Sequence, residues 1–247
     1  MKTLKTIITI TILTLFSISC SSDDDSKPEI KEDLSYSNGN LSTGNISVID
    51  QVAAPAGYTW SQIQIGNESQ GFSANGDYFL ADDFTVPAGE KWNINKINFY
   101  IYKTNYIGED SPVNTIRYEI YSTNPSLEGA KKVYGDFSTN KYSTGIDSKM
   151  YRISNVPGSS VTTRKIFKIT ASAADLELPS GTYWIKWQTA TTDSSSHFHP
   201  SVTVVGSLDL PTYNSLQQNA GVWASLLDKS GSKIDFPFEI VGTKNKI

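Results

Sequence analysis

The pattern that most restricts the fold of this 247-residue chain is a succession of short apolar or alternating runs, broken by turn signals every 8–15 residues or so. The breakers include Pro87-Ala88-Gly89, Asn155-Val156-Pro157-Gly158 and Pro179-Ser180-Gly181. No stretch has a convincing amphipathic helical period, although Leu208–Asn219 could form a turn or two. Because strands without helices must pack on other strands, we expect an all-β fold, an antiparallel β-sandwich that is jelly-roll-like.

The expected strands are rich in β-branched and aromatic residues. They are Ser47–Val52, Tyr58–Ile65, Tyr78–Thr85, Asn93–Lys103, Thr115–Ser122, Lys131–Phe137, Met150–Ser154, Lys165–Ala171, Gly181–Thr189, Ser201–Val205, Val222–Leu226 and Phe236–Val241. No internal repeat is visible, so we expect residues 46–247 to form a single domain.

Alternation within three of these strands separates two faces. The apolar face, expected in the core, carries Ile97, Phe99, Ile101, Ile116, Tyr118, Ile120, Tyr183, Ile185 and Trp187. The second face carries Asn98, Tyr100, Tyr102, Arg117, Glu119, Tyr121, Trp184, Lys186 and Gln188. Flat rings interleaved with amides and charges are typical of surfaces that hold sugars.

This second face is therefore the leading candidate for a ligand-binding site. The residues that we expect to contact a glycan there are Tyr100, Tyr102, Tyr121, Trp184, Arg117 and Glu119. An alternative is that Leu208–Asn219 or an N-terminal strand covers this face, in which case the rings form a minor core.

The N-terminus carries the features of a secretion signal. A basic start with Lys2 and Lys5 is followed by the apolar run Thr6–Ile18, then Ser19 and Cys20, the only cysteine in the chain. This arrangement resembles a bacterial lipobox, with Ser17 in place of the usual leucine. The resemblance implies that residues 1–19 are removed and that Cys20 is acylated with palmitate-type chains, which anchor the protein in a membrane.

The segment after Cys20 is polar. Ser21-Ser22-Asp23-Asp24-Asp25 resembles the acidic start of Bacteroidota surface lipoproteins, which implies display on the outer face of the outer membrane. An ordinary solvated linker, or a periplasmic location, is the alternative. The sequence that follows has no sustained period, so residues 20–45 are expected to be a flexible tether.

Four further segments are similar to a module of secreted and surface proteins from environmental bacteria. They are ADDFTVPAG at residues 81–89, IRYEIYS at 116–122, LPSGTYWIKWQ at 178–188 and FPFEIVG at 236–242. The similarity covers about residues 70–242. It implies a β-sandwich in a secreted protein and assigns no ligand or catalytic residue.

Charge and cysteine content narrow the class of partner. The formal net charge is −4, and removal of the signal with its two lysines makes the mature chain more acidic. A protein of this charge is not expected to bind nucleic acid, which requires a basic face. With Cys20 acylated, neither an internal disulfide nor a thiol nucleophile is expected.

Motifs for catalysis are missing: there is no HExxH, G-x-S-x-G, P-loop or dinucleotide-binding glycine turn. The acids Asp83, Glu109, Glu119 and Asp136 could serve a glycan hydrolase only if the fold placed two of them around one cleft. We therefore expect no enzymatic activity.

Two places could hold a metal. His197 and His199 would share one face of a strand, with Asp193 as the nearest acid, but a loop beside Pro200 is the simpler interpretation. Asp82 is expected to point into the core between Leu80 and Phe84. There it must accept backbone hydrogen bonds, pair with a base or bind a structural calcium ion.

From sequence, the expected function is that of a lipid-anchored cell-surface binding module, non-catalytic and directed at carbohydrate. A structural or adhesive lipoprotein with an envelope-protein partner is the alternative, and a secreted glycan hydrolase is disfavoured by the missing motifs.

We predict that Cys20→Ala abolishes incorporation of labelled fatty acid and releases the protein from the membrane fraction, because no thiol remains to be acylated. Ser19→Ala, which keeps a small residue before the cysteine, is the control and should retain the label. Continued acylation of the Cys20→Ala variant would contradict the lipobox interpretation.

Overall fold

The structure is a computed structural model that describes residues 31–203 and 210–246. Within these residues the chain forms strands and turns and no helix. The strands are β1 (Lys31–Ser37), β2 (Thr59–Gln62), β3 (Tyr78–Tyr102), β4 (Val113–Tyr121), β5 (Lys132–Asp136), β6 (Tyr142–Ile153), β7 (Lys165–Thr191), β8 (Leu216–Asn219), β9 (Val222–Ser225) and β10 (Phe238–Lys246).

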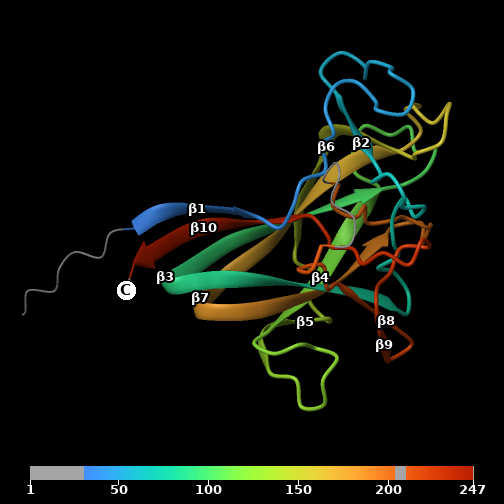
Figure 1. Cartoon of the computed structure of the whole chain (residues 1–247). Helices are drawn as coiled ribbons and strands as arrows, with labels where there is room; N and C mark the ends of the chain where they lie inside the picture. Colours follow the sequence, from blue (N-terminus) through green and yellow to red (C-terminus); the bar gives the residue numbers. More distant parts are fainter. Residues whose placement is uncertain (1–30, 204–209, 247) are drawn as a thin grey trace, which may run out of the picture.

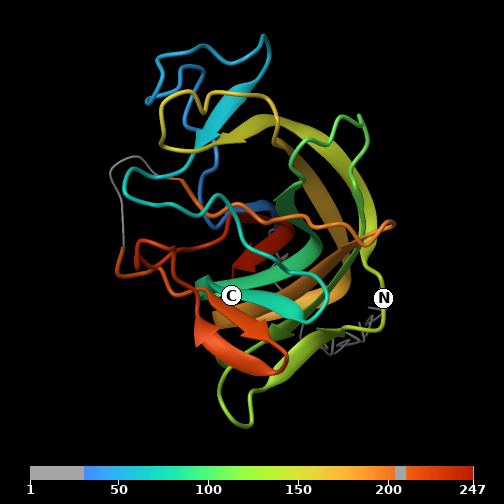
Figure 2. The same cartoon turned by 90° about the vertical axis from the view of Figure 1, so that its right-hand side faces the viewer.

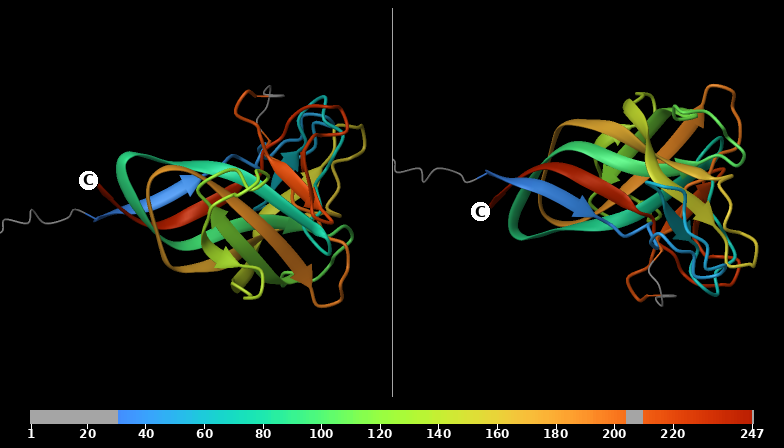
Figure 3. Two further views of the ribbon diagram at one scale, coloured as in Figure 1. Left: turned by 90° about the horizontal axis from the view of Figure 1, so that it is seen from below. Right: turned by 90° about the horizontal axis from the view of Figure 1, so that it is seen from above.

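Two long strands, β3 and β7, pair with each other antiparallel along nearly their whole length. The pairing shifts register between Val86 and Lys91, where both strands turn back on themselves (Figures 1 and 3). Pro87 and Gly89 lie at the bend of β3, and Gly89 has a φ of 78°, which favours glycine. Phe84 before the bend stacks on Trp92 after it, with ring centroids 6.2 Å apart, so the two halves of β3 face each other.

The bent pair connects two layers of sheet. In one layer the order is β1, β10, the second half of β3, the first half of β7, β6 and β2. In the other it is β9, β8, the first half of β3, the second half of β7, β4 and β5. Figure 2 shows the strands curving around a common interior. All pairs are antiparallel except β2 with β6, and the predicted all-β, jelly-roll-like antiparallel β-sandwich is confirmed.

The core lies between the layers and contains the apolar faces predicted from alternation. Ile97, Ile116, Tyr118 and Ile185 have no exposed surface, and Trp187 is 1% exposed. The β10 side chains Phe238 and Ile240, together with Phe236, complete the same cluster. Period-2 alternation is therefore sufficient to assign the inner face of the central strands.

The prediction of a flexible tether through residue 45 is wrong for Lys31–Ser37. These residues form β1, which pairs with β10 along its whole length, and Leu34 is 4% exposed within the main core. The segment is too polar and too short to show a period by itself, and it is a strand because β10 offers an edge. The predicted signal peptide, Cys20 and the start of the tether lie outside the described residues.

Other differences are local. Ser47–Val52 is a turn region rather than a strand, and the end of the suggested helical turn, Leu216–Asn219, is strand β8. Of the expected strand Ser201–Val205, the first three residues are irregular and the last two lie outside the described residues.

We predict that Leu34→Ala lowers the free energy of unfolding by about 2 kcal/mol or more, because it removes a buried side chain from the core. Leu127→Ala, at a position 61% exposed, is the matched control and should change stability by less than about 0.5 kcal/mol. Denaturant unfolding of the three proteins measures both effects. Equal stability of the two variants would show that β1 is dispensable.

Candidate functional site

The aromatic residues predicted to share an exposed face are largely buried, so that expectation is corrected. Tyr102 is 3% exposed and Trp184 is 8% exposed. They also lie in two separate clusters: Tyr102 packs with Tyr100, whereas Trp184 packs with Tyr121. The alternative in which the rings form a minor core applies to Trp184, because Leu216 and Trp223 of the β8–β9 hairpin pack in one cluster with it.

Polar partners on the second cluster are engaged internally. Glu119, 9% exposed, accepts a hydrogen bond from Lys132 Nζ at 2.9 Å and another from the Tyr121 hydroxyl. Burial, and then the hydrogen bond to Glu119, raise the pKa of Tyr121. Arg117 is half-buried, and its Nε has no hydrogen-bond partner among the described residues.

Sequence alternation placed Lys186 on this face but gave no indication of its surroundings. Its ammonium lies 4.3 Å from the ring centroid of Phe79 and 5.1 Å from those of Phe137 and Trp223. It also donates a hydrogen bond to Gln218. Several of the aromatic rings on this face therefore make cation–π contacts with the ammonium group of Lys186.

His197 and His199 are both buried and face the same hydroxyl group. The Nε2 atoms of the two rings lie 2.7 and 2.9 Å from Thr189 Oγ1, and the Ser195 carbonyl lies 3.2 Å from His197 Nδ1. Within residues 31–203 and 210–246, no group of three or more His, Cys, Asp or Glu residues is arranged to hold a metal ion. The pair serves as a buried hydrogen-bond network.

Asp82 points into the core, as predicted, and is fully buried. One carboxyl oxygen accepts hydrogen bonds from the Phe236 N–H at 2.7 Å and from Asn38 Nδ2 at 3.2 Å. The other accepts from the Asp83 N–H at 2.9 Å. This geometry corresponds to the hydrogen-bonded alternative for Asp82.

The candidate site is a pocket that opens beside Asp82, on the edge of β3. Strand β8 pairs with β3 only as far as Ala81, and β10 pairs with it only from Glu90 onward, so among the described residues the edge between them has no strand partner on that side. The pocket has a volume of about 590 Å³ and is bordered by Tyr36–Gly39, Asp83–Thr85, Val202, Leu210, Thr212–Asn214 and Asp235. This size is ordinary for a small-molecule site.

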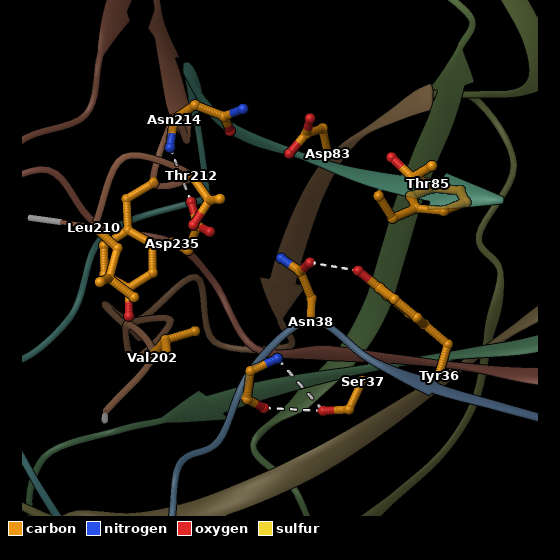
Figure 4. A pocket seen from close by; sticks show the side chains of 13 residues that line it. Tyr36, Ser37, Asn38, Asp83, Thr85, Val202, Leu210, Thr212, Asn214 and Asp235 are labelled. Carbon is orange, nitrogen blue, oxygen red and sulfur yellow. Dashed lines mark hydrogen bonds between the residues drawn. The ribbon is translucent and has the colours of Figure 1, made fainter. Parts of the chain in front are cut away.

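Polar side chains from distant parts of the chain meet in this pocket. Figure 4 shows Asn38, Asp83 and Asn214 around one open space, with Asp235 at the wall. The Asn38 amide accepts a hydrogen bond from the Tyr36 hydroxyl at 2.8 Å, and the Asp235 carboxylate accepts one from the Asn214 N–H at 3.0 Å. The sequence pattern indicates only Asp83 among these residues, because the others lie in segments without a regular period.

The carboxyl groups of the site hold protons more tightly than ordinary carboxyl groups. Burial, and then repulsion from Asp83, raise the pKa of Asp235 to about 7. Burial, and then the charge of Asp235, raise the pKa of Asp82 well above its usual range. Burial also raises the pKa of Asp83. Close to neutral pH the site therefore contains carboxyl groups that can donate as well as accept hydrogen bonds.

The acids considered for hydrolysis do not line this pocket together. Asp83 does, whereas Glu119 pairs with Lys132, and Asp136 accepts hydrogen bonds from Ser138 and Thr139 in a turn. Glu109 is exposed in the loop before β4.

Comparison with known proteins gave no match: no protein-family model, curated protein or solved structure is similar to this chain. In the part of the chain that the structure describes, no helix is long and apolar enough to cross a membrane.

We predict that Asp235→Asn flattens the dependence of stability on pH. The folded-state pKa of about 7 lies above the unfolded value near 4, so the protonated group stabilises the fold at low pH, and this contribution is lost as pH rises toward 7 and beyond. The free energy of unfolding of the wild type, relative to the variant, should fall between pH 4 and pH 8. Denaturant unfolding at several pH values measures this difference.

Asp33→Asn, at an exposed position on β1, is the control and should keep the wild-type profile. An Asp235→Asn profile parallel to that of the wild type would contradict the assignment.

Proposed function

We propose that this protein is a lipid-anchored module of the outer-membrane cell surface that binds carbohydrate without catalysis. The sugar would bind in the pocket at the edge of β3. The signal-like N-terminus with Cys20 and the SSDDD segment support the location, and the pocket supports the ligand class.

The observation that carries the proposal is the convergence of amides and carboxyl groups on one open space. Asn214 offers a donor and an acceptor, and Asp83 and Asp235 offer carboxyl acceptors, of which Asp235 can also hold a proton near neutral pH. The Asn38 amide group donates to Asp82 and to the Phe236 carbonyl, so toward a ligand it offers only its oxygen. Neighbouring hydroxyl groups on a pyranose ring need such mixed partners. Tyr36, half-buried at the same pocket, adds ring surface against which a sugar can pack.

The shape of the pocket also favours recognition of a ligand that projects from a chain or surface. Thr85, Thr212 and Asn214 are exposed at its rim, while Val202, Tyr213 and Asp235 are buried at its wall. A ligand can therefore insert one end and leave the rest in solvent.

We predict that the detergent-solubilised full-length protein binds a subset of glycans on an array. Asp83→Ala and Asn214→Ala should each weaken that binding about tenfold or more, because each removes hydrogen bonds to the sugar that involve a charged or amide group. Dissociation constants are measured by calorimetry with the strongest array ligand.

Asp77→Ala and Asn219→Ala are matched controls, because both positions are exposed and neither lines the pocket. They should bind like the wild type. Absence of any array ligand, or unchanged binding by the pocket variants, would overturn the proposal and leave the structural or adhesive lipoprotein as the remaining interpretation.

A further inference from the structure

A second pocket, of about 660 Å³, lies where the two ends of β3 approach the loop Glu68–Ser73. Tyr78 begins β3 and Tyr102 ends it, and both line this pocket together with Arg164 and Lys229. It shares no lining residue with the pocket that contains Asp83.

The pocket is backed by an arginine that is fully buried. Arg152 donates hydrogen bonds to the Gln70 carbonyl at 2.8 Å, Ser61 Oγ at 3.0 Å and Ser201 Oγ at 3.0 Å. All three acceptors are neutral. Arg152 forms no direct ion pair among the described residues, and the acid whose charge acts on it is Asp228. Burial lowers the pKa of Arg152 to about 10, so the guanidinium is still charged at neutral pH. A buried charge is costly. The charge of the buried Asp228 compensates part of this cost, and a further anion in the pocket would reduce it more.

A second guanidinium stands on the pocket wall. Arg164 is half-buried, and its side chain has no hydrogen bond or ion pair within residues 31–203 and 210–246. Both Arg152 and Arg164 act on the Tyr102 hydroxyl, whose pKa they lower against the stronger effect of burial. The two cations and this hydroxyl therefore lie close to one another at the pocket.

Nearby acids do not neutralise these cations fully. The carboxylate of Asp228 accepts hydrogen bonds from the N–H groups of Glu68, Ser69 and Ser230, at 2.8, 2.7 and 2.9 Å. Glu68 is exposed at the rim, where Lys229 is also exposed. Asp228 offsets part of the charge of Arg152, whereas Arg164 on the pocket wall has no acid partner among the described residues. The positive charge at the pocket wall is therefore that of Arg164.

Ring surface accompanies that charge. Tyr78 is 37% exposed, and Phe198 is half-buried against Tyr102 with ring centroids 5.7 Å apart. Rings beside a guanidinium are suited to a ligand that has both an apolar face and an anionic group.

We propose that this second pocket binds a carboxylate-bearing sugar residue, a uronic acid, with its carboxylate on Arg164 and the field of Arg152 and its ring against Tyr78. The sugar part of this inference rests on the proposed carbohydrate function, whereas the anion contact rests only on the geometry of this pocket.

The test uses the full-length protein in detergent and a trisaccharide of β-1,4-linked glucuronic acid. The matched neutral probe is the β-1,4-linked glucose trisaccharide, which differs only at the carboxyl groups. We expect the acidic trisaccharide to bind at least tenfold more tightly than the neutral one and to weaken as salt is raised. Arg164→Gln should weaken its binding about tenfold or more.

Lys131→Gln removes the same charge at an exposed position outside the pocket and should change binding less than twofold. Asp83→Ala is measured beside Arg164→Gln to separate this inference from the test of the first pocket. Loss of acidic-trisaccharide binding in Asp83→Ala but not in Arg164→Gln would place the ligand in the first pocket and overturn this inference. Equal affinity for the acidic and the neutral trisaccharide would show that the carboxylate is not recognised, and would overturn the assignment. Equal affinity for acetate and the acidic trisaccharide would show that the sugar ring is not recognised, and would overturn it too. So would insensitivity to Arg164→Gln.

Discussion

The pairing of β3 with β7 is the interaction on which the rest of this structure depends. The two strands bend at the same point of their pairing. Their paired halves on either side of the bend therefore form the central strands of both layers. Every other strand of the sandwich attaches to one half of this pair, directly or through a neighbour. The constraint is geometric, because a chain that bends at Pro87–Gly89 must bend its partner too if the hydrogen bonds are to continue on both sides of the corner.

The candidate site is a consequence of how unevenly this central pair is covered. β8 protects the first four residues of β3, and beyond Ala81 the edge is open to the segment around Asn38 and to Asp235. The buried carboxyl group of Asp82 links these segments, because it accepts hydrogen bonds from the Asn38 side chain and from the Phe236 backbone N–H. An open strand edge is a liability in a soluble sheet, and here it is occupied by polar side chains that leave room for a ligand.

Two buried or half-buried cations show two ways of keeping charge inside this fold. Lys186 lies among three aromatic rings, whereas Arg152 is surrounded by neutral oxygen acceptors. The first arrangement is satisfied by the protein itself, because the rings and Gln218 are all present. The second relies on neutral acceptors and on the charge of Asp228, which forms no direct ion pair with Arg152 among the described residues.

The sequence by itself determined the all-β class, the inner faces of β3, β4 and β7, and the inward orientation of Asp82. These properties follow from a period of two, which is local and which any extended strand must obey. Only the tertiary structure decided whether the opposite faces meet solvent. Trp184 is buried because side chains of a hairpin more than thirty residues later in the chain pack against it, and Lys31–Ser37 is a strand because β10 offers an edge. The meeting of Asn38, Asp83, Asn214 and Asp235 was likewise decided by packing, since exposure and side-chain convergence depend on contacts between distant segments that no local pattern encodes.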